Sequence, residues 1–411
     1  MKKSLLKKYA RLIVRSGVAL QKGQELYVYA SIEQAPFVHM VVEEAYKAKA
    51  SKVTVEWEDE TCSKLGYKYR TAESLGEVNP WEIEKLKHRI ASLPARLYIS
   101  SENPDGMKDV DMRKVSKARQ LRYPKLKEYI DQLENKEQWC IAGAAGKDWA
   151  MKVFPNLPAK KAVEALWEAI LKTSRVEEST DPLKVWKDHD DELLKRCNAL
   201  NEMKIKELHY TSSNGTDLRV GLIDKGIWAG GGEFTATKKK IFFNPNIPTE
   251  EVFTSPDKSK TNGIVYSTKP LSYQGQLIED FWVKFENGKA IDVGAKKGED
   301  LLRKMISMDE GAAYLGECAL IAYDSPINNT NILFYNTLYD ENASCHLALG
   351  TGFTNCIEDF QNYEDKEIRT MGVNESMIHV DFMIGAKDLN IEAITYDNKK
   401  VQIFKDGSWA F

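Results

Sequence analysis

The chain has 411 residues, which is too long for one ordinary hydrophobic core, so two domains are expected. Hydrophobic residues make up 43% of the sequence and charged residues 29%, within the normal range for a globular protein. The formal net charge of -3 lacks the excess of basic residues that binds nucleic acids or anionic membranes, so neither is expected as a partner.

The basic N-terminus is predicted to form an amphipathic helix rather than a targeting signal. Its apolar residues between positions 5 and 13 share one helical face, and Lys7, Lys8 and Arg11 interrupt any apolar signal core. No apolar run approaches the roughly 18 residues that a membrane span requires. The 6 cysteines include no CxxC pair, so we expect reduced thiols in a cytoplasmic protein and no structural zinc site.

The first half of the chain alternates between strand-like and helix-like segments. This βαβ pattern is typical of parallel strands covered by helices. In chain order, the predicted elements are strand 25–31, helix 35–50, strand 52–58, strand 96–102, helix 112–134, strand 139–145, helix 158–174 and helix 181–202. We therefore predict an α/β N-terminal domain with a mainly parallel sheet over residues 1–200.

The pattern changes beyond about residue 203. Asn-Gly turns at 214–215 and 287–288 separate strand-like segments, and the chain ends in another hairpin-like pair. One clear helix is expected near 299–309. We therefore predict an α+β C-terminal domain over residues 201–411, rich in antiparallel strands and carrying the active site.

Several common catalytic motifs are missing from the sequence. It contains no GxSxG, no GxxxxGK[ST], no HExxH and no GxGxxG between a strand and a helix. Serine-hydrolase, P-loop and zincin chemistry are therefore not indicated, and the candidates must come from less regular clusters of histidines and carboxylates.

The apolar stretch "MIHVDFMIG" at 377–385 contains two ligand-type side chains, His379 and Asp381. In a strand, residues i and i+2 share a face, so both would point the same way, with their Cα atoms roughly 6.6 Å apart. Val380, Phe382 and Ile384 would point to the opposite face. The alternative is a buried His–Asp hydrogen bond without a metal, because burying either group unpaired costs roughly 1–3 kcal/mol or more.

Three further segments of the same half supply similar groups. "FYNTLYDENASCHLALG" holds Asp340, Glu341 and His346 immediately before an apolar run, although it could also be a capped helix start or a polar loop. Glu317 lies in the small and apolar stretch "AAYLGECALIAY". Glu251 follows another glutamate in "NIPTEEVF", where a solvated helix cap is the alternative.

Together the four segments offer imidazoles and carboxylates, a ligand set that suits Zn²⁺, Co²⁺, Mn²⁺ or Mg²⁺. Four of the side chains would carry negative charges that balance two divalent ions, namely Glu251, Glu317, Glu341 and Asp381. Two metals about 3.5–4 Å apart, bridged by a carboxylate and a water, form a common hydrolase centre.

At these segments the sequence resembles the M29 metallo-aminopeptidases of the aminopeptidase T type. The resemblance extends over the whole chain and is densest from 244 to 385. It implies a cytosolic exopeptidase acting on peptides, a two-domain homodimer and two divalent ions. It also implies a set of metal ligands: Glu251, Glu317, Glu341, His346, His379 and Asp381.

One position departs from the pattern of the resembled family. A tyrosine is typical seven residues after the first ligand histidine, and Phe353 stands there instead. Phenylalanine cannot donate a hydrogen bond to an oxyanion, so a catalytically weakened metal- or peptide-binding homologue is one alternative. Another two-metal hydrolase, with Lys238, Lys239 and Lys240 clamping a phosphoester, is a second. Glu250 and Glu341 are both candidates for the proton carrier.

Overall fold

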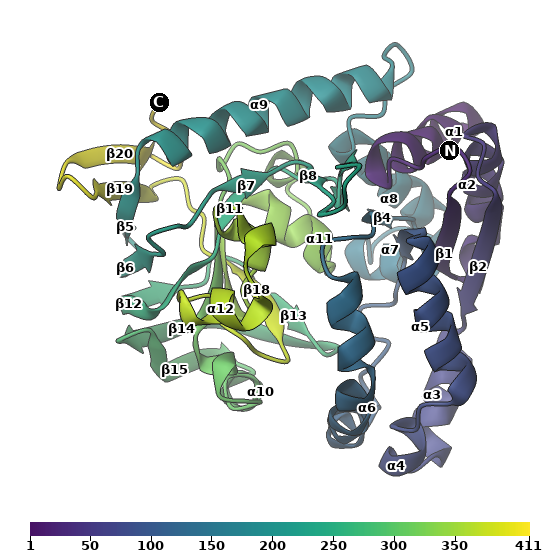
Figure 1. Cartoon of the computed structure of the whole chain (residues 1–411), viewed down its shortest axis with the longest axis horizontal. Coiled ribbons are helices and arrows are strands. Elements are labelled where there is room, and N and C mark those ends of the chain that lie inside the picture. Colours follow the sequence, from purple (N-terminus) through teal and green to yellow (C-terminus); the bar gives the residue numbers. More distant parts are fainter. The chain divides into compact units, whose positions relative to one another are not determined.

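The computed structural model describes all residues from 1 to 411 (Figure 1). The chain forms two compact units, and each consists of two stretches of sequence. Unit 1 comprises residues 1–187 and 232–248, and unit 2 comprises residues 188–231 and 249–411. The first division falls inside helix α9 (Pro182–Glu202).

Unit 1 is built around a five-stranded parallel sheet with the strand order β10-β4-β3-β1-β2. Its strands are β1 (Glu25–Ser31), β2 (Lys52–Glu58), β3 (Ala95–Ser100), β4 (Trp139–Gly143) and β10 (Asn246–Ile247). The first four lie where the βαβ pattern predicts strands. The fifth comes from the separate stretch 232–248, which also forms a small hairpin of β8 (Glu233–Phe234) and β9 (Phe242–Phe243).

The helices of unit 1 include the predicted ones and four that the sequence pattern did not predict. They are α1 (Lys3–Leu12), α2 (Ala35–Lys47), α3 (Glu60–Tyr69), α4 (Ala72–Leu75), α5 (Pro80–Ser92), α6 (Met112–Leu133), α7 (Lys147–Val153) and α8 (Ala159–Thr173). The four unpredicted helices are α3, α4, α5 and α7. α1 continues as a π-helical turn to Gly17. Neither α3 nor α5 has a fully buried residue, and the apolar residues of α5 at helical spacing, Ile83, Leu86 and Ile90, are only partly buried.

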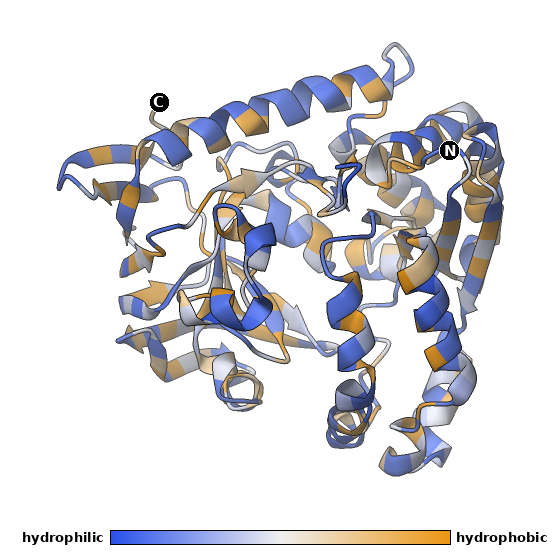
Figure 2. Cartoon of the chain, viewed as in Figure 1, coloured by the Kyte–Doolittle hydropathy of each residue, from blue (hydrophilic) through white to orange (hydrophobic).

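Hydrophilic residues predominate along α9 and apolar residues interrupt them, as Figure 2 shows. The apolar residues at helical spacing that face unit 2 include Leu193, Cys197 and Leu200, which are buried in its core. None of the helices combines the length and apolar composition needed to cross a lipid bilayer.

Unit 2 contains a nine-stranded sheet with the order β13-β14-β12-β6-β5-β19-β20-β21, in which β15 also pairs with β14. Its strands are β5 (Ile205–Thr211), β6 (Asp217–Leu222), β12 (Pro256–Tyr266), β13 (Leu271–Tyr273), β14 (Gln276–Glu286), β15 (Lys289–Lys297), β19 (Asn390–Thr395), β20 (Lys400–Lys405) and β21 (Ser408–Trp409). The Asn-Gly turns join β5 to β6 and β14 to β15, as predicted. At the second turn, Asn287 and Gly288 both have positive φ angles, which a tight hairpin requires.

A second antiparallel sheet of unit 2, here called the ligand sheet, has the order β18-β17-β16-β11-β7. Its strands are β7 (Ala229–Gly230), β11 (Val252–Thr254), β16 (Leu315–Leu320), β17 (His346–Gly350) and β18 (His379–Met383). Three short helices, α10 (Glu299–Met305), α11 (Thr337–Asp340) and α12 (Asp365–Thr370), connect the strands of this unit. The predicted fold class, a parallel α/β part and an antiparallel-rich α+β part, is confirmed.

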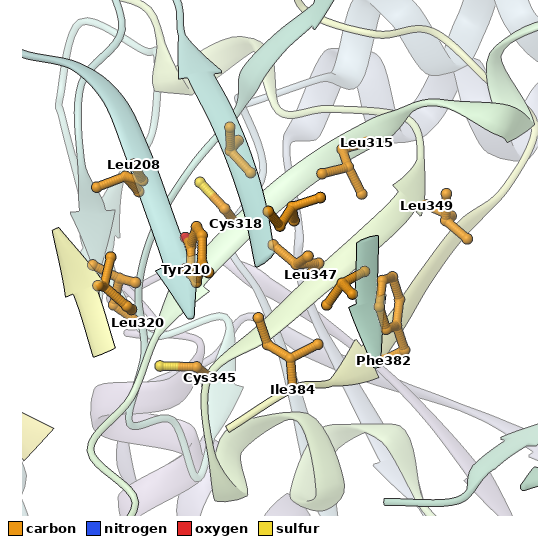
Figure 3. Close-up of a cluster of buried hydrophobic side chains, with 14 of the residues drawn as sticks. Leu208, Tyr210, Leu315, Cys318, Leu320, Cys345, Leu347, Leu349, Phe382 and Ile384 are labelled. Atoms are coloured by element: carbon orange, nitrogen blue, oxygen red, sulfur yellow. The ribbon is translucent and has the colours of Figure 1, made fainter. Parts of the chain in front are cut away.

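The core of unit 2 lies between its two sheets (Figure 3). Side chains from one face of the ligand sheet, including Leu347, Leu349 and Phe382, pack with Leu208 and Tyr210 of β5. These residues alternate with the ligand-type side chains along each strand. The face opposite the core is therefore the one that carries the polar groups.

Replacing Leu347 by alanine should destabilise the fold, because its side chain is fully buried between the sheets. The expected loss is about 2–5 kcal/mol in the free energy of unfolding, from lost burial and the cavity left behind. Urea denaturation monitored by tryptophan fluorescence measures it. A loss below about 1 kcal/mol would show that this face of the strand does not anchor the ligand sheet.

Candidate metal centre

The polar face of the ligand sheet carries the residues that the sequence singled out. His346 projects from β17, and His379 and Asp381 project from β18. Val380, Phe382 and Ile384 belong to the core on the opposite face. The predicted alternation of "HVDFMI" is therefore confirmed.

Glu317 reaches this face through a β-bulge at Gly316. Leu315 pairs with Leu349 and Glu317 pairs with Ala348, so Gly316 is an additional residue in β16. The bulge turns Leu315 into the core while Glu317, two positions later, points to the opposite face. Only glycine fits there, because a Cβ on Gly316 would lie 2.2 Å from the carbonyl oxygen of Thr351.

Small residues separate the ligand-type side chains in the register of the sheet. Ala348 lies between Glu317 and Asp381 on the neighbouring strands. His346 has Ala319 on one side and Met383 on the other. Ala348 and Ala319 are fully buried, and their methyl groups leave space above the sheet into which the longer side chains converge. Ala348 thus forms the floor of the cluster.

The converging side chains form two triads that share one carboxylate. The first triad is Glu251, Glu317 and His346, and the second is Glu317, His379 and Asp381. Within each triad the candidate ligand atoms all lie within 4.8 Å of one another. His346 Nε2 is 3.4 Å from Glu251 Oε2. His379 Nε2 is 3.1 Å from Glu317 Oε2 and 3.2 Å from Asp381 Oδ1.

Glu341 lies at the edge of the same cluster, in a short 3-10 turn before β17. Its carboxyl group hydrogen-bonds to Asp381, and its backbone carbonyl accepts a hydrogen bond from His346 Nδ1 at 2.8 Å. Asp340 is separate from the cluster. Its carboxylate accepts the backbone N–H groups of Phe334 and Asn336 and thereby fixes the preceding loop.

Both histidines are oriented by backbone carbonyl groups. His346 Nδ1 faces the carbonyl of Glu341, and His379 Nδ1 donates to the carbonyl of Thr351 at 2.8 Å. Since a carbonyl only accepts, each Nδ1 must carry a proton. Each Nε2 therefore points into the carboxylates, and in the neutral ring it presents a lone pair. This arrangement is the usual support of a histidine that binds a metal.

The buried acids of the cluster raise one another's pKa. Burial, together with the carboxylates of Glu251 and Asp381, raises the pKa of Glu317 to about 6 although His379 opposes the shift. Burial and then Asp381 raise the pKa of Glu341 well above its usual range. Burial would also raise the pKa of Asp381, but His379 and His346 outweigh it and lower that pKa to about 2.

The pKa values of both imidazoles are also raised. Burial alone would lower the pKa of His346, but the carboxylates of Glu251 and Glu317 outweigh it and raise that pKa to about 9. Asp381 and Glu317 likewise hold the pKa of His379 well above its usual range, against the effect of burial. The cluster thus attracts positive charge strongly, as protons or as cations.

The donor set fits divalent cations. Four carboxylates and two imidazoles offer the oxygen and nitrogen ligands that such ions prefer. Asp381 Oδ1 is buried and faces the cluster, with His379 Nε2 at 3.2 Å. Two divalent ions would balance the four negative charges.

The sequence matches the thermophilic metalloprotease family M29 over residues 2–409. The chain belongs to the M29 metalloprotease family. The predicted family and the predicted enzyme class, a hydrolase of the metallopeptidase type, are therefore confirmed. Membership also implies a divalent metal as cofactor.

Curated relatives of this M29 chain match it from end to end. Aminopeptidase AmpS of Bacillus subtilis (strain 168) is 43% identical, with 99% of this chain and 98% of that protein covered. Aminopeptidase T of Thermus aquaticus is 37% identical, with 98% of each covered.

Solved structures extend the comparison. Wild-type AmpT from Thermus thermophilus superimposes with a TM-score of 0.89 at 35% identity and covers 100% of both chains. A 2,5-dihydroxypyridine dioxygenase from Pseudomonas putida KT2440 has a TM-score of 0.54 at 11% identity, covering 99% of this chain and 96% of that one, which shows a shared fold alone.

His189 lies next to the candidate centre and was not among the residues that the sequence singled out. Only 11% of its side chain is exposed, although its neighbours in the sequence are highly charged. Its Nε2 donates to the carbonyl of Thr249 at 2.8 Å and lies 3.9 Å from Glu250 Oε2. Trp186, one turn earlier on α9, is fully buried. A large aromatic residue at this spacing was the sequence signal that the same face of the helix is covered.

Enlarging Ala348 should lower the metal content of the candidate centre without altering any of its candidate ligands. Its replacement by valine puts two methyl groups on the floor between Glu317 and Asp381, so the metal content of the purified chain should fall. Ala393→Val, in the core of the other sheet, is a matched control for a buried alanine in a strand. Plasma emission spectrometry measures the ions, and an unchanged content in Ala348→Val would contradict the assignment of the floor.

Proposed function

We propose that this chain is an aminopeptidase that removes N-terminal residues from peptides, with unit 2 as the catalytic unit. The observation that carries the proposal is the pair of triads sharing Glu317. Such an arrangement suits two divalent ions bridged by one carboxylate. The names of the curated relatives, which are aminopeptidases, give further support.

In the proposed centre, each triad holds one ion. Glu251, Glu317 and His346 would hold the first, and Glu317, His379 and Asp381 the second. Glu341, in contact with Asp381, would complete the set. When bound, the divalent ions (Zn²⁺, Co²⁺, Mn²⁺ or Mg²⁺) would supply a water of lowered pKa and polarise the scissile carbonyl.

Between the two candidates for the proton carrier, we favour Glu250. Glu341 is engaged with Asp381 inside the cluster, whereas Glu250 lies outside both triads and next to Glu251. Its backbone N–H donates to Asn342 Oδ1 at 2.8 Å, and His189 lies beside its carboxylate. These contacts hold Glu250 where it could pass a proton to the leaving amine.

Chelation tests the proposed activity. Aminoacyl 4-nitroanilides should be hydrolysed by the metal-loaded chain, and their N-acetylated forms should not be, because an exopeptidase requires a free amino group. Thorough metal stripping should abolish turnover, and added Zn²⁺ or Co²⁺ should restore it. Undiminished turnover by the stripped protein would refute the proposal.

Phe353 is the feature that favours a catalytically weakened homologue. Its ring lies 4.9 Å from the imidazole of His379 and presents no hydrogen-bond donor. The alternative phosphoester hydrolase has less support. Of the three lysines that would clamp a phosphoester, Lys239 already donates a hydrogen bond to Gln21 Oε1 at 2.8 Å.

Phe353→Tyr should increase turnover. A hydroxyl added beside His379 supplies an oxyanion donor of the kind worth about 2.7–4 kcal/mol, so kcat should rise by roughly 10²-fold or more with little change in KM. Phe353→Leu, which adds no donor, is the matched control and should give no increase. Equal kcat values for the tyrosine variant and the wild type would show that another group already serves the oxyanion.

A further inference from the structure

Two phenylalanines form an aromatic pair beside the ligand cluster. Phe253 lies on β11, two residues after Glu251, and pairs with Ala319 on the ligand face of the sheet. Phe353 follows β17, and the two ring centroids are 5.4 Å apart at an interplanar angle of 65°. Both side chains are only half-buried. The pair therefore presents apolar surface next to the candidate ligands.

The aromatic pair adjoins the accessible edge of the centre. Among the residues of the triads, the side chain of His379 is the most exposed at 23%, compared with 11% or less for the other four. The centroid of the Phe353 ring lies 4.9 Å from the centroid of this imidazole. Phe353 therefore borders the most exposed side chain of the two triads.

Hydrogen bonds fix the backbone at Phe353. The backbone N–H of Phe353 donates to Ser255 Oγ at 2.8 Å, and Ser255 lies two residues after Phe253 on the same segment. The preceding Gly352 donates to the carbonyl of Asn374 at 2.9 Å and accepts from Arg369 Nη1 at 3.0 Å. A binding surface that is already fixed can discriminate between substrates, because few protein groups lose conformational freedom when a substrate binds.

We infer that the Phe253–Phe353 pair receives the side chain of the substrate's first residue and selects apolar side chains. The inference rests on the proposed aminopeptidase function. The scissile carbonyl must lie at the ligand cluster, and the Cβ of the first residue is only two bonds from that carbon. The free ammonium group has stronger partners in the carboxylates than in a ring face, which leaves the rings to the side chain.

The test compares specificity ratios in the full-length, Zn²⁺-loaded chain. For each variant, kcat/KM is measured with leucyl and alanyl 4-nitroanilide. Phe253→Ala should lower the leucine-to-alanine ratio about tenfold or more, the range expected for lost contacts in an apolar site. Phe253→Leu should retain a higher leucine-to-alanine ratio than Phe253→Ala. If the alanine variant does not fold, the leucine variant is compared with the wild type instead. Phe411→Ala, an exposed phenylalanine elsewhere, should leave the ratio unchanged.

A binding measurement separates this inference from the proposed function. Calorimetry gives the dissociation constants of the phosphonic acid analogues of leucine and alanine, which are not cleaved. If the wild type hydrolyses neither amide but prefers the leucine analogue, and Phe253→Ala removes that preference, the proposed activity fails and the inference stands. If Phe253→Ala binds metal normally and weakens both substrates or both analogues equally, the inference is overturned.

Discussion

Glu317→Gln is expected to abolish most of the aminopeptidase activity and to remove bound metal. Glutamine preserves the volume of the side chain but removes the charge that both triads share. Its amide N–H₂ would also face the neighbouring carboxylates and imidazole instead of a cation. Since a bound metal supplies several kcal/mol of transition-state stabilisation, we expect a loss of roughly 10³-fold or more in kcat.

Ion content and turnover measured on the same sample test this result. Glu392→Gln, on β19 of the other sheet and paired with Lys400 at 2.7 Å, is a matched control and should keep both. A Glu317→Gln chain that retains two ions and wild-type turnover would refute the shared carboxylate. Loss of turnover with full ion content would assign Glu317 a catalytic role other than metal binding.

Metal removal is expected to destabilise the fold, and more strongly as the pH rises. In the ion-free chain, the carboxylates raise the pKa of His346 from 6.5 to about 9, despite burial. This stabilisation, on the order of 3 kcal/mol, is present below about pH 6.5 and is lost as the pH rises through 9. Glu317, whose pKa burial raises to about 6, contributes with the same sign at lower pH.

Metal binding has the opposite pH dependence, because ligands must lose their protons before they bind an ion. The difference in melting temperature between the metal-loaded and the chelated chain should therefore widen from pH 6 to pH 9. Scanning calorimetry with and without chelator measures it. Replacing both His346 and His379 by glutamine should flatten this pH dependence, and a difference that stays constant in the unmodified chain would contradict the assigned cluster.

Much of the fold and of the candidate site could be predicted from local patterns. Alternation of apolar and ligand-type residues placed His379 and Asp381 on one face because the side-chain period of a strand is fixed at two. Asn-Gly dipeptides marked hairpins because both central residues of a tight turn require positive φ angles. These rules hold wherever one local interaction dominates.

Other features depend on contacts that no local pattern contains. Strict alternation would place Leu315 and Glu317 on the same face, and the bulge at Gly316 separates them. An isolated glycine inside an apolar strand was the available signal. Helix α5 has no fully buried residue, but Asn79 and Glu82 form a capping box that marks its start.

The excursion of residues 232–248 has a consequence for how such a protein can be divided or recombined. The polypeptide passes between the units at 187/188, 231/232 and 248/249, so neither unit is a continuous piece of the gene. A fragment starting at residue 201 would carry β10 without its partner β4 and would lose nearly all of α9, including the buried Leu193 and Cys197. Shuffling of one unit alone is thereby disfavoured. If both units are inherited together, relatives should align with this chain over their whole length. The two curated relatives do so over 98% of their length.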